Sequence, residues 1–165
     1  MAQPRSPQEV FLALVNGVAD GRLDELPDLY AEQTDVVHPF DPLRAPALRS
    51  RDEIRAHFGH RRQSAPPDAA PRPPRPHRRV ANVTIHQTTD PEVIVAEFEY
   101  QEIADGTGEP TVLPAIFVLR VRDGEIVSSR DYHDHITSAR ARGQLDELFA
   151  AIKTQDGAAR IDAQT

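Results

Sequence analysis

Residues 128–136, which read SSRDYHDHI, bring two carboxylates and two histidines together near the end of the chain. Carboxylates and imidazoles are the side chains that most often move protons in enzymes, and they also bind metal ions. Successive side chains of an extended strand point to opposite faces, so Asp131, His133 and His135 are expected to share one face. The stretch therefore predicts a proton-transfer site, a metal site or a polar strand end.

The preceding segment predicts the neighbour of Asp131. An Asp-Gly pair at 123–124 separates two alternating apolar runs, which indicates a two-residue hairpin turn with Arg122 opposite Glu125. Continuing that register places Ile116 opposite Asp131. An apolar neighbour disfavours the ionised acid and raises its pKa, as a proton carrier near neutral pH requires. The alternative is a strand-end aspartate satisfied by a neighbouring arginine or backbone N–H.

Two other carboxylates, Glu97 and Glu99, also share a strand face. They are either an acid/base pair facing the same cavity as Asp131, where they would contact the substrate, or the solvated face of an outer strand. Three ligands in a row on one strand rarely converge on one ion, so we predict no metal at 131–135.

The elements that must position these residues predict an α+β fold in which a curved sheet wraps around helices and leaves a cavity. Ser6, Pro7 and Glu9 begin the first helix with a capping box, and Ser50 with Glu53 begin another. Apolar periodicity and turn residues place the remaining elements. These are a short helix at 23–30, an edge strand at 34–40, four antiparallel strands at 80–89, 92–103, 111–122 and 125–135, and a closing helix at 137–153.

The length of 165 residues predicts one domain over 1–165, with a core at about 6–153 and a disordered tail at 154–165. Residues 61–79 are rich in proline and arginine, which predicts a flexible solvated loop. The alternatives for this loop are a lid over the pocket or a basic clamp for an anionic ligand.

Composition excludes several classes of protein. The net charge of −7 argues against a general nucleic-acid binder, and the absence of cysteine excludes disulfides and thiolate metal sites. No apolar run approaches the roughly 20 residues of a membrane span. The first ten residues lack the apolar core of a signal peptide, so we expect a cytoplasmic protein.

Two stretches resemble the SnoaL-like branch of the nuclear-transport-factor-2-like superfamily. They are VVHPFDPLRAPALRSRDEIRAHF at 36–58 and FVLRVRDGEIVSSRDYHDHI at 117–136. The resemblance covers about 6–152. It implies a cone-shaped antiparallel sheet around the N-terminal helices, a pocket for a small hydrophobic molecule, and a homodimer formed through the outer face of the sheet.

The resemblance also implies roles for individual residues. Asp131 matches the position of a catalytic carboxylate in limonene epoxide hydrolase-like enzymes and phenazine-biosynthesis A/B-type proteins. His57 matches a histidine that the latter place on the same helix, and His38 and Phe40 share a face of a pocket-lining strand. The epoxide hydrolases need an Arg-x-Asp pair where this chain reads AEFEY at 96–100, which argues against epoxide opening.

We therefore predict a cofactor-independent enzyme of isomerase, cyclase, dehydratase or condensation type, acting on a hydrophobic carbonyl-containing secondary metabolite. Asp131 would move the proton, and His57, His133 or His38 would polarise the oxygen or return the proton. Phe58, which shares a helix face with Ile54, would contact the substrate. The alternatives are a non-catalytic binding protein with the same cavity and a dimeric interaction module whose own side chains fill the cavity.

Overall fold

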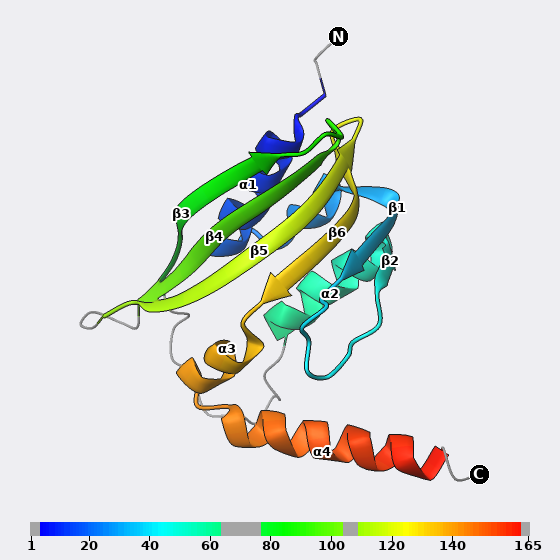
Figure 1. The fold of residues 1–165 in the computed structure, drawn as a ribbon, viewed down its shortest axis with the longest axis vertical. Helices are drawn as coiled ribbons and strands as arrows, with labels where there is room; N and C mark the ends of the chain where they lie inside the picture. Colours follow the sequence, from blue (N-terminus) through cyan, green and yellow to red (C-terminus); the bar gives the residue numbers. More distant parts are fainter. Residues whose placement is uncertain (1–3, 64–76, 104–108, 163–165) are drawn as a thin grey trace.

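The computed structural model describes residues 4–63, 77–103 and 109–162. Figure 1 shows the elements in chain order. They are α1 (Pro7–Ala19), the 3₁₀ turn η1 (Leu26–Leu29), β1 (Tyr30–Val37), β2 (Leu48–Ser50), α2 (Arg51–Gln63), β3 (His77–Gln87), β4 (Val93–Ile103), β5 (Thr111–Arg122), β6 (Glu125–His133), α3 (His135–Ala141) and α4 (Leu145–Asp162).

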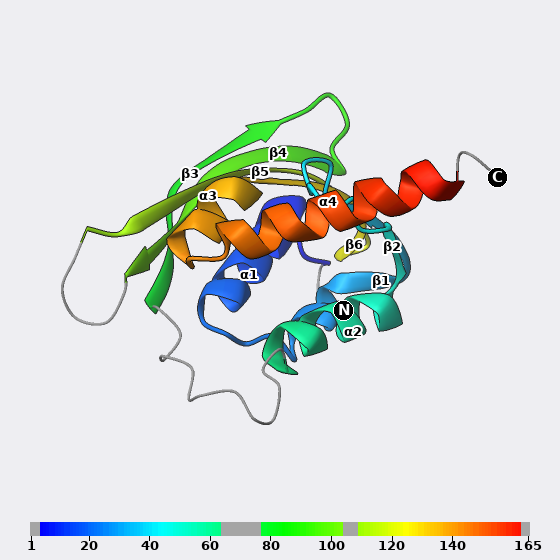
Figure 2. The same ribbon diagram turned by 90° about the horizontal axis from the view of Figure 1, so that it is seen from below.

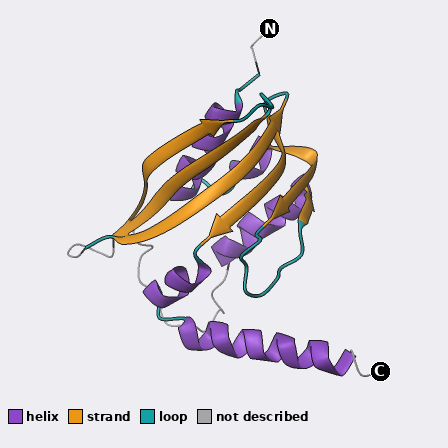
Figure 3. Cartoon of the chain, in the orientation of Figure 1, coloured by secondary structure: helices purple, strands orange, loops and turns teal. Residues whose placement is uncertain are grey.

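One curved, unclosed sheet of six strands forms the frame, in the order β2-β1-β6-β5-β4-β3 (Figure 3). β1 pairs with β6 in parallel, and the other neighbouring strands are antiparallel. The predicted α+β class is confirmed, although the sheet is mixed rather than purely antiparallel. α1 and α2 lie on the same side of the sheet, and α4 runs across the end of the molecule where α3 lies (Figures 1 and 2).

The apolar stripe of α1 packs on the inner face of the sheet. Val10, Phe11 and Val15 are fully buried, and the Phe11 ring meets Phe98 edge-on at a centroid distance of 5.3 Å. The predicted capping box is present: Ser6 Oγ accepts the Glu9 N–H, and the Glu9 carboxylate accepts the Ser6 N–H. Such a cap stabilises a helix by about 1 kcal/mol, so sequence and packing agree on where α1 begins.

The strand predicted at the sheet edge is not an edge strand. β1 lies between β2 and β6, because the three residues of β2 add a short outer strand. β1 also ends at Val37, so His38 and Phe40 lie beyond it and strand alternation no longer governs them. The short helix predicted at 23–30 is the 3₁₀ turn η1.

The C-terminal region also differs from its prediction. The closing helix is divided into α3 and α4 at Gly143, whose φ of 67° lies in the left-handed region that favours glycine. α4 continues to Asp162, into the segment expected to be a disordered tail. Of the predicted loop, 61–63 belong to α2 and 77–79 to β3, and 64–76 lie outside the described residues. None of the described helices is long and apolar enough to cross a membrane.

A one-residue bulge in β6 decides which side chains face inward. The hairpin begins in the predicted register, with Arg122 opposite Glu125, but Val127 is an extra residue without a partner in β5. Beyond it, Asp131 lies opposite Phe117 and not opposite Ile116. Because an extra residue reverses the alternation, Ile126 is buried before the bulge and Asp131 after it.

Candidate active site

A cavity of about 330 Å³ lies between the inner face of the sheet, α1, α2 and the beginning of α3. This volume is at the lower end of the range of small-molecule sites. Leu14, Val36, Ile54 and Phe58 give the cavity apolar walls. The polar lining comes mainly from four histidines and three aspartates: His38, His57, His133, His135, Asp41, Asp131 and Asp134.

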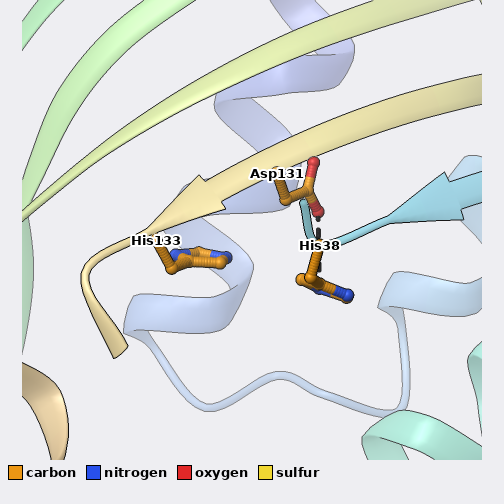
Figure 4. Close-up of side chains that lie close together, drawn as sticks. All are labelled: His38, Asp131 and His133. Atoms are coloured by element: carbon orange, nitrogen blue, oxygen red, sulfur yellow. Dashed lines mark ion pairs between the residues drawn. The ribbon is translucent and has the colours of Figure 1, made fainter. Parts of the chain in front are cut away.

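Asp131 is the most deeply buried of these carboxyls, with only 5% of its surface exposed. Ser129, two residues earlier on the same strand face, donates a hydrogen bond to Asp131 Oδ1. The Nε2 atom of His38 lies 3.9 Å from Asp131 Oδ2 (Figure 4). Burial raises the pKa of Asp131 from an ordinary 3.8 to about 7, outweighing the opposite effects of the Ser129 hydroxyl and the Arg130 charge.

The neighbouring arginine does not bind the Asp131 carboxyl. Arg130 points to the other side of β6, where its guanidinium donates to the Asp35 carboxylate at 2.8 Å and to the Asp35 carbonyl at 3.1 Å. The interpretation of Asp131 as a strand-end aspartate paired with this arginine therefore does not match the geometry. Asp131 is a carboxyl that can be protonated or ionised near neutral pH and that faces a cavity.

Three imidazoles stand in a row beside Asp131, and we call them the histidine column: His57, His38 and His133. The central ring, His38, lies 5.8 Å from His57 and 5.9 Å from His133 between centroids, with interplanar angles of 23° and 22°. The Phe117 ring meets His133 edge-on at 5.2 Å. The column provides donors and acceptors on the cavity side of a carboxyl that can carry a proton.

Different elements hold the members of the column. β1 and β6 are parallel, and their last pair, Val37 with Arg130, leaves His38 next to Asp131. His57 follows the buried Ile54 by three residues on α2, which places both on one side of the helix. His133 follows Asp131 by two residues and therefore shares its strand face.

The structure brings together five of the nine residues predicted for the site, namely Asp131, His38, His57, His133 and Phe58. The other four, Phe40, Ile116, Glu97 and Glu99, line a wider groove of about 630 Å³ on the outer face of the sheet. Ile116 alternates with the buried Ala115 and Phe117 of β5 and therefore faces outward. Phe40 lies beyond the end of β1, and its exposed ring contacts Tyr132 edge-on at a centroid distance of 5.1 Å.

Glu97 and Glu99 alternate with the buried Phe98 and therefore point away from Asp131. Glu97 lies 3.7 Å from His86, and Glu99 accepts hydrogen bonds from Asn82 and Gln101. Of the two interpretations of these glutamates, the geometry matches the outer strand face and not an acid/base pair with Asp131.

Other residues of the cavity were not predicted from the sequence. Ser129 could have been found, because alternation places it on the Asp131 face. Arg78 and Arg142, which both line the cavity, come from the beginning of β3 and the end of α3. No local pattern pairs segments so far apart in the sequence.

Among the described residues, His38, Asp131 and His133 also form a group that could hold a metal ion. One ligand atom each from His38, Asp131 and His133 lie within 4.8 Å of one another (Figure 4), and this donor set suits divalent transition metals. The set differs from the one weighed from the sequence, because His135 begins α3 and does not continue β6. The nearly parallel rings of the column would have to turn before they could point at one ion. That the site works without a metal stays a prediction.

Comparisons with known proteins agree with this fold. The model of the SnoaL-like domain family matches residues 11–129. An uncharacterised PhzA/B-like protein of Pseudomonas aeruginosa is 32% identical over 80 residues, which are 48% of this chain and 55% of that protein. The chain thus spans about half the length of this curated relative.

Two solved structures illustrate the shared architecture. An isomerase candidate from Bacillus subtilis has a TM-score of 0.66 at 21% identity, covering 84% of this chain and 93% of its own. A polyketide cyclase candidate from Pseudomonas putida has a TM-score of 0.58 at 17% identity, and the match covers 82% of this chain and 97% of that protein. Identities this low show the fold alone. The family match covers most of the chain, and the resemblance found in the sequence is confirmed: this protein belongs to the SnoaL-like domain family.

Proposed function

We propose that this protein is a cofactor-independent enzyme that transfers a proton at a carbon next to a carbonyl group of a small hydrophobic molecule. The observation that carries the proposal is the Asp131 carboxyl, which is buried at the wall of a cavity, has a pKa near 7 and lies 3.9 Å from an imidazole nitrogen. A base with such a pKa is ionised in part at neutral pH and still basic enough to accept a proton from carbon.

The proposed reaction begins when ionised Asp131 takes the proton from the carbon, and the electron pair of the broken C–H bond moves into an enolate. The His38 imidazole donates a hydrogen bond to the enolate oxygen, where the negative charge develops. Asp131 then returns the proton to the same or another carbon, so that no atom is gained or lost. Isomerase, cyclase, dehydratase and condensation reactions all share this first step.

The walls of the cavity support the same function. Apolar side chains of α1, β1 and α2 line most of it, which limits water and strengthens electrostatic interactions with the reacting atoms. Phe58 contacts the His57 ring at 5.4 Å and holds that end of the histidine column. We assign substrate contact to Phe58 and not to the four residues on the outer face.

The outer groove has a different proposed role, as the contact surface of a homodimer. Phe40, Ile116 and Ile136 expose 68%, 40% and 46% of their surfaces there. Apolar side chains gathered in this way are typical of an interface. We further propose that residues 1–165 form one domain and that the protein is cytoplasmic. The proposed substrate is a secondary metabolite.

The test is proton exchange in heavy water. A panel of cyclic ketones and β,γ-unsaturated ketones is incubated with the protein, and loss of the α-proton signals is followed by NMR. We expect exchange with at least one member of the panel, reduced roughly 10²-fold or more in Asp131→Asn. Asp123→Asn, the same change at an exposed turn, is the matched control. Exchange that is equal in both variants would overturn the proposal, and the same cavity would then belong to a non-catalytic binder.

A further inference from the structure

We propose that the cavity contains a second subsite, formed by Arg78 and Arg142, which binds the carboxylate group of the ligand. Both guanidiniums line the same cavity as Asp131, although one belongs to β3 and the other follows α3. The inference rests on the proposed function only in naming the ligand as its substrate, because anion binding itself needs no catalysis.

A buried carboxylate holds the two arginines together. Glu102 exposes only 6% of its surface, and it does not line the cavity. It accepts hydrogen bonds from Arg78 through Nε, at 3.0 Å, and Nη2, and from Arg142 through Nη2 at 3.2 Å. Burial alone would raise the pKa of Glu102, but the two guanidiniums lower it below its usual value. One ionised carboxylate therefore faces two cations, and one positive charge is left over.

The arginines also keep hydrogen-bond donors for a ligand. Each guanidinium has five N–H donors, and Glu102 takes only some of them. Arg142 uses Nη1 for the Ser138 hydroxyl at 2.6 Å, and Arg78 lies over the Tyr100 ring at 4.8 Å from its centroid. These contacts fix both planar groups before a ligand arrives, and a fixed guanidinium is well suited to bind a carboxylate through two parallel hydrogen bonds.

Two other acids of the cavity, Asp41 and Asp134, bind backbone groups and not these arginines. The Asp41 carboxylate accepts the N–H groups of Leu43 and Ala45, and Asp134 caps α3 by accepting the Thr137 N–H. Among the described residues, Glu102 is the only carboxylate that binds Arg78 or Arg142. At the guanidiniums themselves, two positive charges meet the one negative charge of Glu102, and this local excess favours an anionic group on the part of the ligand that reaches them.

This subsite narrows the class of substrate. The ligand has an apolar body that fits the cavity, a carbonyl group for Asp131 and His38, and a carboxylate for the two arginines. Of the alternatives for the Pro/Arg-rich stretch at 61–79, the subsite favours a basic clamp for an anionic ligand, because Arg78 belongs to that stretch. Binding the carboxylate would orient the carbonyl group relative to the buried acid.

The experiment compares two probes of equal shape, 2-naphthoate and 2-naphthamide, by isothermal titration at pH 6 and low salt. We expect the charged probe to bind roughly tenfold more tightly to the unaltered protein, since a hydrogen bond to a charged group contributes about 1.5–3 kcal/mol. In Arg142→Met the preference should fall below about threefold, while naphthamide affinity stays the same. Arg140→Met, which replaces an exposed arginine in the last turn of α3, is the matched control and should keep the preference.

Two further variants keep the test decisive. Arg142→Lys preserves the charge without the planar fork and should show an intermediate preference. The double variant Arg78→Met with Glu102→Gln removes one cation and the buried anion together and should also lose the preference. Equal binding of the two probes to the unaltered protein, or an unchanged preference in Arg142→Met, would overturn the inference. The two proposals can also fail separately. If Asp131→Asn still prefers 2-naphthoate, and neither the unaltered protein nor any variant exchanges protons, the anion subsite stands and the acid/base function is refuted.

Discussion

Replacing Asp131 by asparagine should change how the stability of the protein depends on pH. The folded state raises the pKa of this carboxyl from 3.8 to about 7, so the folded chain holds its proton more tightly than the unfolded chain does. Below pH ~4 both states are protonated, and the group makes no difference. Between pH ~4 and ~7 the unfolded chain has lost the proton and the folded chain keeps it, so the contribution of this carboxyl to stability falls as pH rises.

The size of the effect follows from the shift. Each pH unit between the two pKa values is worth about 1.36 kcal/mol, so the difference of roughly 3 units gives roughly 4 kcal/mol. The penalty reaches its full size above pH ~7, where folding must bury an ionised carboxylate. Asparagine has nearly the same shape and no charge, and its side-chain oxygen can still accept the Ser129 hydroxyl. Asp131→Asn should therefore gain stability relative to the unaltered protein as pH rises.

The assay is urea denaturation of both proteins at several values of pH from 4 to 8, analysed with one shared slope. We expect the difference in free energy of unfolding to grow by roughly 3–4 kcal/mol over this range and to level off above pH ~7. Asp123→Asn at the exposed turn should show no such trend. NMR titration of labelled carboxyls then identifies the group that titrates near pH 7.

Two outcomes would refute the reasoning. If the difference between the proteins does not vary with pH, Asp131 is not desolvated. If the unaltered protein gains stability relative to Asp131→Asn as pH rises, Asp131 is stabilised as an anion, as an ion-paired carboxylate would be.

The other predictions concern catalysis, assembly and register. His38→Gln should lower the rate of proton exchange by roughly 10²-fold or more with little change in ligand affinity, measured by NMR exchange and titration calorimetry; an unchanged rate would assign the role to another member of the column. The exchange rate of the unaltered protein should rise with pH and level off above about 7, because the base must be ionised; a rate that falls over this range would mean that Asp131 acts as an acid. Ile116→Asp should convert a dimer into a monomer, measured by light scattering; a monomer before the change would remove the proposed interface. Deleting Val127 should turn Arg130 and Tyr132 toward the core and abolish the cooperative unfolding transition; a deletion variant with normal unfolding would show that the bulge does not hold the register.

Much of the frame follows from local patterns in the sequence. The capping box at Ser6, the Asp-Gly turn at 123–124 and the alternation of β4 and β5 appear as predicted, because each depends on residues close together in the chain. Asp131 was also identified from its neighbours in sequence and from family resemblance.

The set of residues that lines the cavity is decided by the tertiary structure and not by local sequence. Arg78 and Arg142 meet at Glu102 only because β3, β4 and α3 come together in the fold, and His38 reaches Asp131 only because β1 is parallel to β6. Such contacts depend on the packing of distant segments, about which local periodicity carries no information.

The bulge at Val127 decided the side of the sheet to which the Asp131 side chain points. In the hairpin register read from the turn, Arg130 and Tyr132 would point inward and Asp131 outward, because side chains alternate strictly along a strand. One unpaired residue reverses that alternation, and the valine gives no local sign of it. The sequence by itself determined that an acid and histidines lie close together near the end of the last strand. Only the pairing of β5 with β6 decided that the acid is buried at a cavity, beside Phe117, with its pKa raised to about 7.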